Sequence, residues 1–275
     1  MESNNLFHDR YFLERLLGKG NFSEVWLAKD VKTEIQVVLK IYTLPKEIGM
    51  DTQKMNAFSR EFNYLSELCH PNLLIPTVWN SSEKNIYTVT PYCKRGNVLM
   101  EIGTMDEKNI WRFVNDISKG LAFLHSRKIV LQSLNIGRNV ISPLSILIGD
   151  NYYMINMNHF YSFEQLIRTT IGDWSAGNPI YLAPECFSWK EKPTKASDIW
   201  SFGALIFEMV AGYAPFEFCG GCVGGLAQKN GAKIPELPNT WSKQLRKTIT
   251  MCLSEKPSNR PSAADLVDRA LKNVN

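Results

Sequence analysis

Two glycines close together, Gly18 and Gly20, are the first residues in this sequence whose type and spacing suggest chemistry. They stand in the run LGKGNFSEVWLA (17–28), between two stretches in which apolar and polar residues alternate as in β-strands. Because glycine has no Cβ, the backbone amides of such a hairpin can approach a phosphate group closely. The same pattern is also common in plain turns, so its meaning depends on the rest of the chain.

The second feature is a gap in the acidic residues. From residue 117 to residue 149 the chain has neither aspartate nor glutamate, although Asp116 and Asp150 flank this stretch. Phosphoryl transfer needs Mg²⁺ to neutralise phosphate charge and a carboxylate to orient and deprotonate the attacking hydroxyl. No carboxylate from residues 117 to 149 can therefore take part in such a reaction.

The elements that would position these residues follow from periodicity. Alternation predicts β-strands over 12–18, 24–30 and 35–42 and near 74–79 and 85–90. Helical spacing predicts helices over 53–69, 106–126, 198–211, 241–253 and 262–272. Pro91 and the segment CKRGN (93–97) break the pattern and suggest a hinge. We expect an α+β fold in a single domain over 1–275, with a small β-rich lobe at about 1–91, a hinge at 92–97 and a larger α-helical lobe at 98–275.

Composition narrows the class of protein. The chain has 275 residues, 44% of them apolar, and a net charge of +4 that is spread along the sequence. Without a cluster of Lys and Arg, we expect no nucleic-acid partner and no membrane surface. Residues 1–11 have no apolar signal-peptide core, and Glu208 interrupts the longest apolar stretch, so we expect a cytoplasmic protein without a membrane span.

The cysteines do not predict a metal site. Of the six, only Cys219 and Cys222 form a C-x-x-C pair, in a glycine-rich segment. A zinc site would need two further ligands, and the four histidines lie far away in the sequence. We expect two reduced cysteines in a loop.

Several motifs stand in the order and spacing found in the eukaryotic-type, Ser/Thr-like protein kinase domain. Besides residues 17–28, they are VVLK (37–40), EFNYLSELCHPNLL (61–74), YLAPE (181–185), SDIWSFG (197–203) and SNRPSAADL (258–266). The chain resembles this family over most of its length. The resemblance implies a bilobal kinase-like fold with a nucleotide site and a protein substrate or partner.

For the phosphates of ATP, the resemblance implies a role for four residues. The amides of Gly18 and Gly20 would contact the phosphates, and Lys40, at the end of VVLK, would hold them. Glu61, in the helix that follows, would form an ion pair with Lys40.

For the adenine ring, the resemblance implies a second set of residues. Val25 and Val38 would line the pocket, and Val38 replaces the smaller alanine that is usual in the family. Thr90 would be the small residue at the back of the pocket. The Pro91 carbonyl and the Cys93 amide would meet the edge of the base. We therefore expect a site that can still hold a nucleotide.

The catalytic motifs of the family are degenerate. LHSRKIVLQSL (124–134) aligns with the catalytic loop, which puts Ser133 in place of the aspartate of H-R-D. YYMINMNHF (152–160) aligns with the strand that leads into D-F-G, which puts Met157 in place of the aspartate. Mg²⁺ requires oxygen ligands, so Met157 cannot bind it.

The position of the family's metal-binding asparagine has two possible alignments. If PLSILIGD (143–150) matches the family's P-D-N-I-L, the residue is Ser145, which we favour because an apolar run and a turn follow it correctly. If LNIGRNVI (134–141) matches instead, Asn139 is retained. Neither alignment restores an aspartate.

The structural frame of the family is retained. Glu185 and Arg260 match its long-range ion pair. Asp198 is expected to cap the N-terminus of the central helix and to bind the backbone of the catalytic loop.

The leading hypothesis is a pseudokinase, a regulator or scaffold for a protein partner, which can bind ATP without requiring Mg²⁺. The alternative is an active Ser/Thr kinase or related phosphotransferase that uses a relocated carboxylate, Asp150 or Glu164. A third hypothesis is a structural interaction domain whose nucleotide site is empty.

Overall fold

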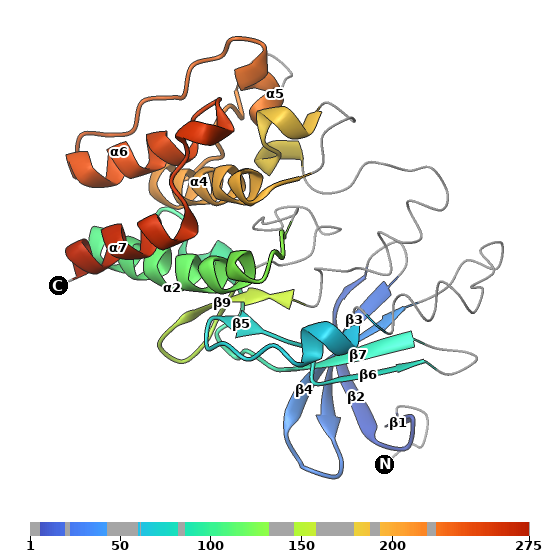
Figure 1. Cartoon of the computed structure of the whole chain (residues 1–275). Helices are drawn as coiled ribbons and strands as arrows, with labels where there is room; N and C mark the ends of the chain where they lie inside the picture. The colour runs from blue at the N-terminus through green and yellow to red at the C-terminus, as the bar shows by residue number, and fades with distance from the viewer. Residues whose placement is uncertain are drawn as a thin grey trace. The chain divides into compact units, whose positions relative to one another are not determined.

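The computed structural model describes residues 6–19, 23–42, 60, 62–81, 86–131, 146–157, 179–187, 193–218 and 224–274. The chain divides into two compact units (Figure 1). Unit 1 comprises Met1–Lys94, Arg138–Ser142 and Asn156–Ala176, and unit 2 comprises Arg95–Gly137, Pro143–Ile155 and Gly177–Asn275.

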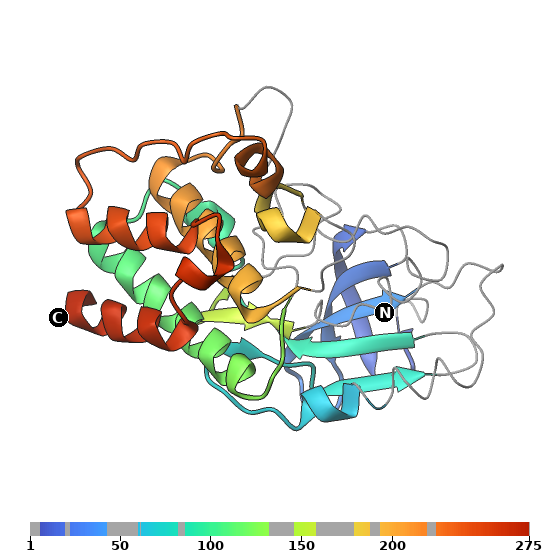
Figure 2. The ribbon, with the colours of Figure 1, turned by 45° about the horizontal axis from the view of Figure 1, so that its top comes forward.

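Unit 1 is built on a six-stranded antiparallel sheet with the strand order β1-β2-β3-β4-β7-β6, drawn in blue to cyan in Figure 2. Its strands are β1 (Leu6–Phe7), β2 (Tyr11–Lys19), β3 (Ser23–Asp30), β4 (Gln36–Tyr42), β6 (Val78–Ser81) and β7 (Ile86–Pro91). A further short strand, β5, covers Leu73–Leu74. Three expected strands, 12–18, 24–30 and 35–42, are confirmed to within one residue at each end.

One face of this sheet buries an aromatic and aliphatic core, which comprises Tyr11, Ala28, Leu39, Tyr87 and Val89. The rings of Tyr11 and Tyr87 meet edge to face with their centroids 6.1 Å apart. The N-terminal strand β1 extends this core, because Phe7 packs edge to face on Tyr87 at 5.1 Å. The short β1 strand is therefore tied to the sheet by side-chain packing as well as by strand pairing.

An ion pair joins the start of β2 to the end of β3. Both the Nε and the Nη2 of Arg10 donate to Asp30, with Nη2 2.8 Å from Oδ2. The Arg10 hydrogen bonds lower the pKa of Asp30 to about 2, although burial opposes this effect. Because β2 and β3 are consecutive strands, the pair reinforces the register of the hairpin.

The helix expected over 53–69 is described only in part. Residues 60 and 62–66 are helical, and the apolar side chains Phe62, Leu65 and Leu68 are buried at helical spacing. The backbone N–H of Asn72 donates to Nδ1 of His70 at 3.1 Å, which fixes the turn after the helix.

Unit 2 is mainly helical. Its helices are α2 (Glu107–Ser126), α4 (Lys195–Ala211), α5 (Gly224–Lys229), α6 (Lys243–Cys252) and α7 (Ala263–Val274), and its 3₁₀ turns are η2 (Val98–Glu101), η4 (Pro179–Tyr181), η5 (Pro184–Phe187) and η6 (Pro257–Asn259). A hairpin of β8 (Ile146–Ile148) and β9 (Tyr153–Asn156) accompanies them. In Figure 1, α7 lies along α2, and α6 lies beside α4. Within the part of the chain that the structure describes, no helix is both long enough and apolar enough to cross a membrane.

The central helix α4 starts earlier than expected. We expected it to begin at Asp198, but it begins at Lys195, and Thr194 is the N-cap. Thr194 and Ser197 form a reciprocal capping box, and this satisfies the backbone groups at the helix start. The expectation that Asp198 caps the helix is therefore wrong. Asp198 lies in the first turn, where its carboxylate is available for other contacts.

Candidate functional site

Several residues of the expected nucleotide site share one face of the unit 1 sheet. Val25 pairs directly with Lys40 across β3 and β4, and Val38 pairs with Thr90 across β4 and β7. Residues directly opposite each other in an antiparallel pair point to the same face, and so do residues two apart along a strand. Val25, Val38, Lys40 and Thr90 therefore form one surface, on the side opposite the aromatic core.

Lys40 is the most unusual residue on this face. Its side chain is only 2% exposed, and its Nζ lies 5.0 Å from the centroid of the Tyr42 ring. Burying an ammonium group is unfavourable unless other groups stabilise its charge. The Tyr42 ring is one group that can stabilise the charge of this buried ammonium. Glu61, its expected ion-pair partner, lies outside the described residues.

The glycine hairpin is described on both sides of its tip. Gly18 pairs with Val25, Lys19 pairs with Glu24, and a register shift precedes Gly18. Lys19 Nζ lies 2.8 Å from Glu24 Oε1, and Trp26 Nε1 donates to the same carboxylate at 3.1 Å. These two contacts, with Lys19 first, lower the pKa of Glu24. Gly20 lies outside the described residues, so its contact with phosphate stays a prediction.

The residues expected to face the adenine edge stand at the end of β7. Thr90 is buried, whereas Pro91, the last residue of β7, is exposed and pairs with Val37. Cys93 follows two residues later and is half-buried. The order of these residues suits a strand end that presents backbone groups, and their contact with a base stays a prediction.

At the position expected for the metal-binding aspartate, the chain has a buried methionine. Met157 directly follows β9 and is 2% exposed. A thioether is not a ligand for Mg²⁺. Across the described residues, no group of three His, Cys, Asp or Glu is arranged to hold a metal ion. Ser133, Ser145 and Asn139, and the cysteine pair at 219 and 222, lie outside the described residues.

The two aspartates that flank the acid-free stretch differ in surroundings. Asp116, on α2, accepts a hydrogen bond from the Tyr153 backbone N–H at 3.1 Å, and burial raises its pKa. It therefore helps to anchor the start of β9. Asp150 is exposed in the turn between β8 and β9, and Gly149 N–H donates to Tyr152 O at 2.8 Å to close this turn. Glu164 lies outside the described residues.

Asp198 holds the segment that precedes the degenerate catalytic loop. Its Oδ2 accepts a hydrogen bond from the Leu131 backbone N–H at 2.9 Å and lies 2.8 Å from His125 Nε2. All three residues are buried. Asp198 therefore fixes the backbone at Leu131, within the stretch that has no acidic residue.

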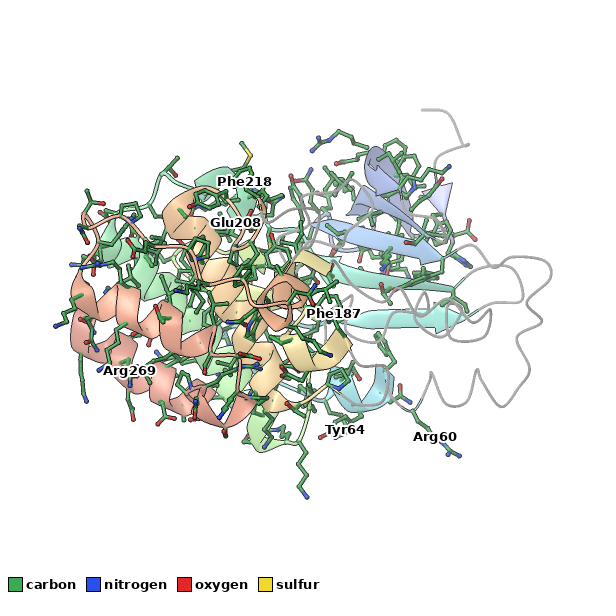
Figure 3. The ribbon with its side chains drawn as sticks, turned by 90° about the horizontal axis from the view of Figure 1, so that it is seen from above. Arg60, Tyr64, Phe187, Glu208, Phe218 and Arg269 are labelled. Atoms are coloured by element: carbon green, nitrogen blue, oxygen red, sulfur yellow. The ribbon has the colours of Figure 1, made fainter. Side chains whose placement is uncertain are left out.

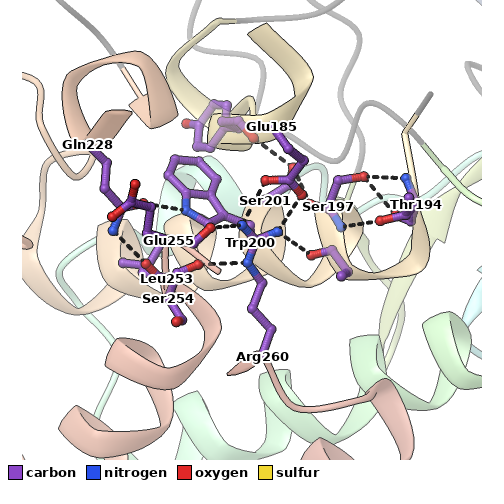
Figure 4. A network of polar contacts seen from close by, with 12 residues as sticks. Glu185, Thr194, Ser197, Trp200, Ser201, Gln228, Leu253, Ser254, Glu255 and Arg260 are labelled. Atoms are coloured by element: carbon purple, nitrogen blue, oxygen red, sulfur yellow. Dashed lines mark hydrogen bonds and ion pairs between the residues drawn. The ribbon is translucent and has the colours of Figure 1, made fainter. Parts of the chain in front are cut away.

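Arg260 and Glu185 form the long-range ion pair that the sequence predicts (Figure 4). The pair is bidentate, with Nη1 2.6 Å from Oε1 and Nη2 2.8 Å from Oε2. The guanidinium is fully buried and also donates to the carbonyls of Ser254, Ala196 and Glu255. It ties η5 to α4 and to the segment before η6, so one side chain organises three parts of unit 2.

The segment YLAPE (181–185) is also held from the side of α4. Ser201 Oγ donates to the Tyr181 carbonyl at 2.7 Å, and the Tyr181 hydroxyl donates to the buried Glu208. Glu208 lies within α4, whereas Phe218, beyond the helix end, is largely exposed (Figure 3). Tyr181 therefore connects the segment to α4 at two points.

Helix α5 makes a close backbone contact with the same segment. Gly225 N–H donates to Leu182 O at 2.9 Å. A Cβ at Gly225 would stand 2.3 Å from Pro184 N, which leaves no room for a side chain. Gln228 adds a polar link, accepting from Trp200 Nε1 at 3.1 Å and donating to Leu253 O at 2.7 Å (Figure 4).

Sequence reasoning did not identify Tyr42, Gly225 or Gln228. Tyr42 could have been found, because a residue two positions after Lys40 in a strand must share its face. Gly225 and Gln228 carried no local signal, since their importance comes from contacts with residues distant in sequence.

The fold and these contacts define the class of protein. Residues 11–271 match the protein kinase domain family, and the chain belongs to this family. It has the protein kinase fold, in which an N-terminal antiparallel sheet precedes a mainly helical part.

The chain is similar to several protein kinases, two of which are named serine/threonine-protein kinases. Over 257 residues the chain is 25% identical to mitogen-activated protein kinase kinase kinase 3 of Arabidopsis thaliana, a match that covers 92% of this chain and 41% of the relative. It is 32% identical over 211 residues to a serine/threonine-protein kinase SIK3 homolog of Danio rerio, a match that covers 75% of this chain and 17% of the relative. It is 26% identical over 265 residues to CBL-interacting serine/threonine-protein kinase 10 of Arabidopsis thaliana, a match that covers 93% of this chain and 52% of the relative. The chain thus spans about half or less of the length of these relatives.

Proposed function

We propose that this chain is a pseudokinase, a kinase-fold regulator or scaffold that binds ATP but transfers phosphate inefficiently or not at all. The observation that carries the proposal is Met157, a buried apolar side chain where the family's D-F-G motif supplies a Mg²⁺ ligand. Without this ligand, the metal that neutralises the transferring phosphate has lost its main attachment.

The acid-free stretch supports the same conclusion, because it concerns the base that would deprotonate the attacking hydroxyl. The aligned base position is Ser133, and no aspartate or glutamate occurs between 117 and 149. Loss of one preorganised electrostatic contributor typically lowers a rate by about 10² to 10³. When the base and the metal ligand are both absent, little activity should remain.

The proposal of ATP binding rests on the sheet face of unit 1. Val25, Val38, Lys40 and Thr90 share this face, and Lys40 supplies positive charge there. A phosphate can interact with this charge directly. We therefore propose that ATP binds without requiring Mg²⁺, because Met157 replaces the main metal ligand.

The retained frame supports a role in protein interaction. Contacts with Arg260, Ser201 and Gly225 connect the YLAPE segment to three other parts of unit 2. A frame that is fixed in this way suits a scaffold, whose protein partner is not identified.

Thermal melting with nucleotide tests the binding step. ATP should raise the melting temperature equally in EDTA, Mg²⁺ and Mn²⁺, because the proposed binding does not require a metal. The shift should be easy to measure, since a ligand at about 100 times its Kd adds about 2.7 kcal/mol of stability. Lys40→Ala should abolish the shift. Lys29→Ala, which removes an exposed lysine that pairs only loosely with Glu34 at 3.7 Å, is the matched control and should keep it. No shift at millimolar ATP would favour a structural interaction domain, and a shift only with Mg²⁺ would reveal an oxygen ligand.

A transfer assay tests the chemical step. Incubation with radiolabelled ATP and Mg²⁺ or Mn²⁺ should label neither the protein itself nor generic substrates. Transfer that disappears in Asp150→Ala or Glu164→Ala would contradict the proposal and would establish a kinase with a relocated carboxylate.

A further inference from the structure

Tyr42 is the neighbour of Lys40 on the face opposite the aromatic core of unit 1. The two residues are two positions apart on β4, so their side chains point the same way. Pairing between β3 and β4 runs without a break from Ser23↔Tyr42 to Lys29↔Gln36. A regular register of this length leaves the Tyr42 ring no alternative face.

The geometry of the pair is that of a cation–π interaction. The Lys40 ammonium lies 5.0 Å from the ring centroid, inside the limit of about 6 Å for such contacts. Tyr42 is only 3% exposed and Lys40 is 2% exposed. The attraction between a cation and the negative face of a ring is stronger when both are removed from water. A buried ring also has few rotamers, so it limits where the ammonium can lie.

An aromatic ring is a suitable partner for a lysine that must bind phosphate. A carboxylate, such as that of the expected partner Glu61, attracts the ammonium but also brings a full negative charge, which repels phosphate, so a ring can help to position Lys40 without adding a second negative charge. The ring attracts the ammonium through its quadrupole and carries no net charge. Positive charge at Lys40 is therefore preserved while its position is restricted.

We propose that Tyr42 is a positioning residue for nucleotide binding, which holds the Lys40 ammonium in place for the phosphates of a bound nucleoside triphosphate. This inference rests on the proposed ATP binding. It adds that the electron density of the Tyr42 ring, and not only its volume, contributes to affinity. The hydroxyl group of Tyr42 is not required for this role.

The experiment lowers the electron density of the ring in steps while its shape is nearly unchanged, and it then removes the ring. Position 42 is occupied in turn by tyrosine, phenylalanine, phenylalanines with one and three ring fluorines, and leucine. Calorimetry then measures Kd for ATP and for adenosine, which has no phosphate. Tyr42→Phe should bind ATP like the wild type, fluorination should weaken ATP binding stepwise, and Tyr42→Leu should weaken it about fivefold or more. Adenosine binding should be the same throughout.

The controls separate positioning from packing. In the Lys40→Ala background, which should no longer bind ATP, fluorination should leave the affinity for adenosine unchanged. Equal ATP affinity across the fluorinated series, or parallel losses for ATP and adenosine, would overturn the inference while leaving the proposed ATP binding intact. A wild type that binds ATP not at all would overturn both. If Tyr42→Leu does not fold, the fluorinated series decides the question, since those rings keep the volume of phenylalanine.

Discussion

Replacement of Arg260 by alanine should destabilise unit 2 by about 3 kcal/mol. The change removes a bidentate pair with Glu185 and three hydrogen bonds to backbone carbonyls. Removal of one partner of a buried pair typically costs about 3 to 5 kcal/mol, because the other charge stays buried without compensation. The Glu185 side chain is 11% exposed, so water can reach it in part, and the lower end of this range applies.

The loss should be visible in a melting curve. For a protein of this size, each kcal/mol shifts the melting temperature by about 2 to 4 °C, so we expect a decrease of about 6 to 12 °C for the transition of unit 2. Circular dichroism reports the helical unit, and calorimetry separates its transition from that of unit 1 if the two unfold independently. Arg127→Ala, at the exposed end of α2, is a matched control and should change the melting temperature little.

A double-mutant cycle isolates the pair itself. Glu185→Ala and the double variant complete the cycle with Arg260→Ala, and the double variant should be less destabilised than the sum of the single changes. Arg260→Lys should recover only part of the loss, because lysine lacks the planar fork that contacts both carboxylate oxygens. A melting temperature of Arg260→Ala within about 1 °C of the wild type, or strict additivity in the cycle, would refute this reasoning.

Three further predictions concern stability in both units. Met157→Asp should lower the free energy of unfolding by at least about 3 kcal/mol at pH 7, because it buries a carboxyl group in place of an apolar side chain. This loss of stability should grow as pH rises above about 4, because the new carboxyl group then ionises in the unfolded chain before it ionises in the folded one. Gly225→Ala should destabilise unit 2 by about 2 kcal/mol or more, since its Cβ would stand 2.3 Å from Pro184 N. Arg10→Gln should cost about 1 kcal/mol at pH 7. The depressed pKa of Asp30, about 2 against an ordinary 3.8, means that this stabilisation is present above pH 4 and is lost as pH falls toward 2.

Each of these predictions has a measurement and a control. Met157→Leu conserves volume and should be nearly neutral in urea denaturation, whereas equal stability of the Asp variant would show that the site is polar. Gly149→Ala, whose new Cβ would meet only the partly exposed Tyr152 ring, should be milder than Gly225→Ala in thermal melting. For Arg10→Gln, denaturation at several pH values should show a difference from wild type that shrinks below pH 4, and a constant difference would contradict the assigned pKa of Asp30.

Periodicity predicted most elements of the fold because it depends only on neighbouring residues. Alternation along β2 to β4 and the apolar stripe of α2 can be read locally, and the observed elements agree with them to within one residue at each end. The start of α4 was predicted wrongly. Asp198 is a common N-cap residue, but the reciprocal bonds of Thr194 and Ser197 place the cap four residues earlier.

Part of the candidate site could also be predicted from the sequence. The sequence identified Lys40, Val25, Val38 and Thr90 through spacing and resemblance, and the strand register places them on one face. It also predicted the pair between Glu185 and Arg260. Both predictions came from the resemblance to the kinase motifs, and the contact of the four sheet residues with a nucleotide stays a prediction.

By itself, then, the sequence determined which residues alternate, which motifs occur in which order, and which acidic side chains are missing from 117 to 149. Only the tertiary structure decided that Met157 is buried, that the Tyr42 ring meets the Lys40 ammonium and that Gly225 has no room for a Cβ. The physical reason is that burial and close approach depend on segments distant in sequence coming together. No local pattern encodes the distance between such segments, whereas strand and helix periods repeat within a few residues.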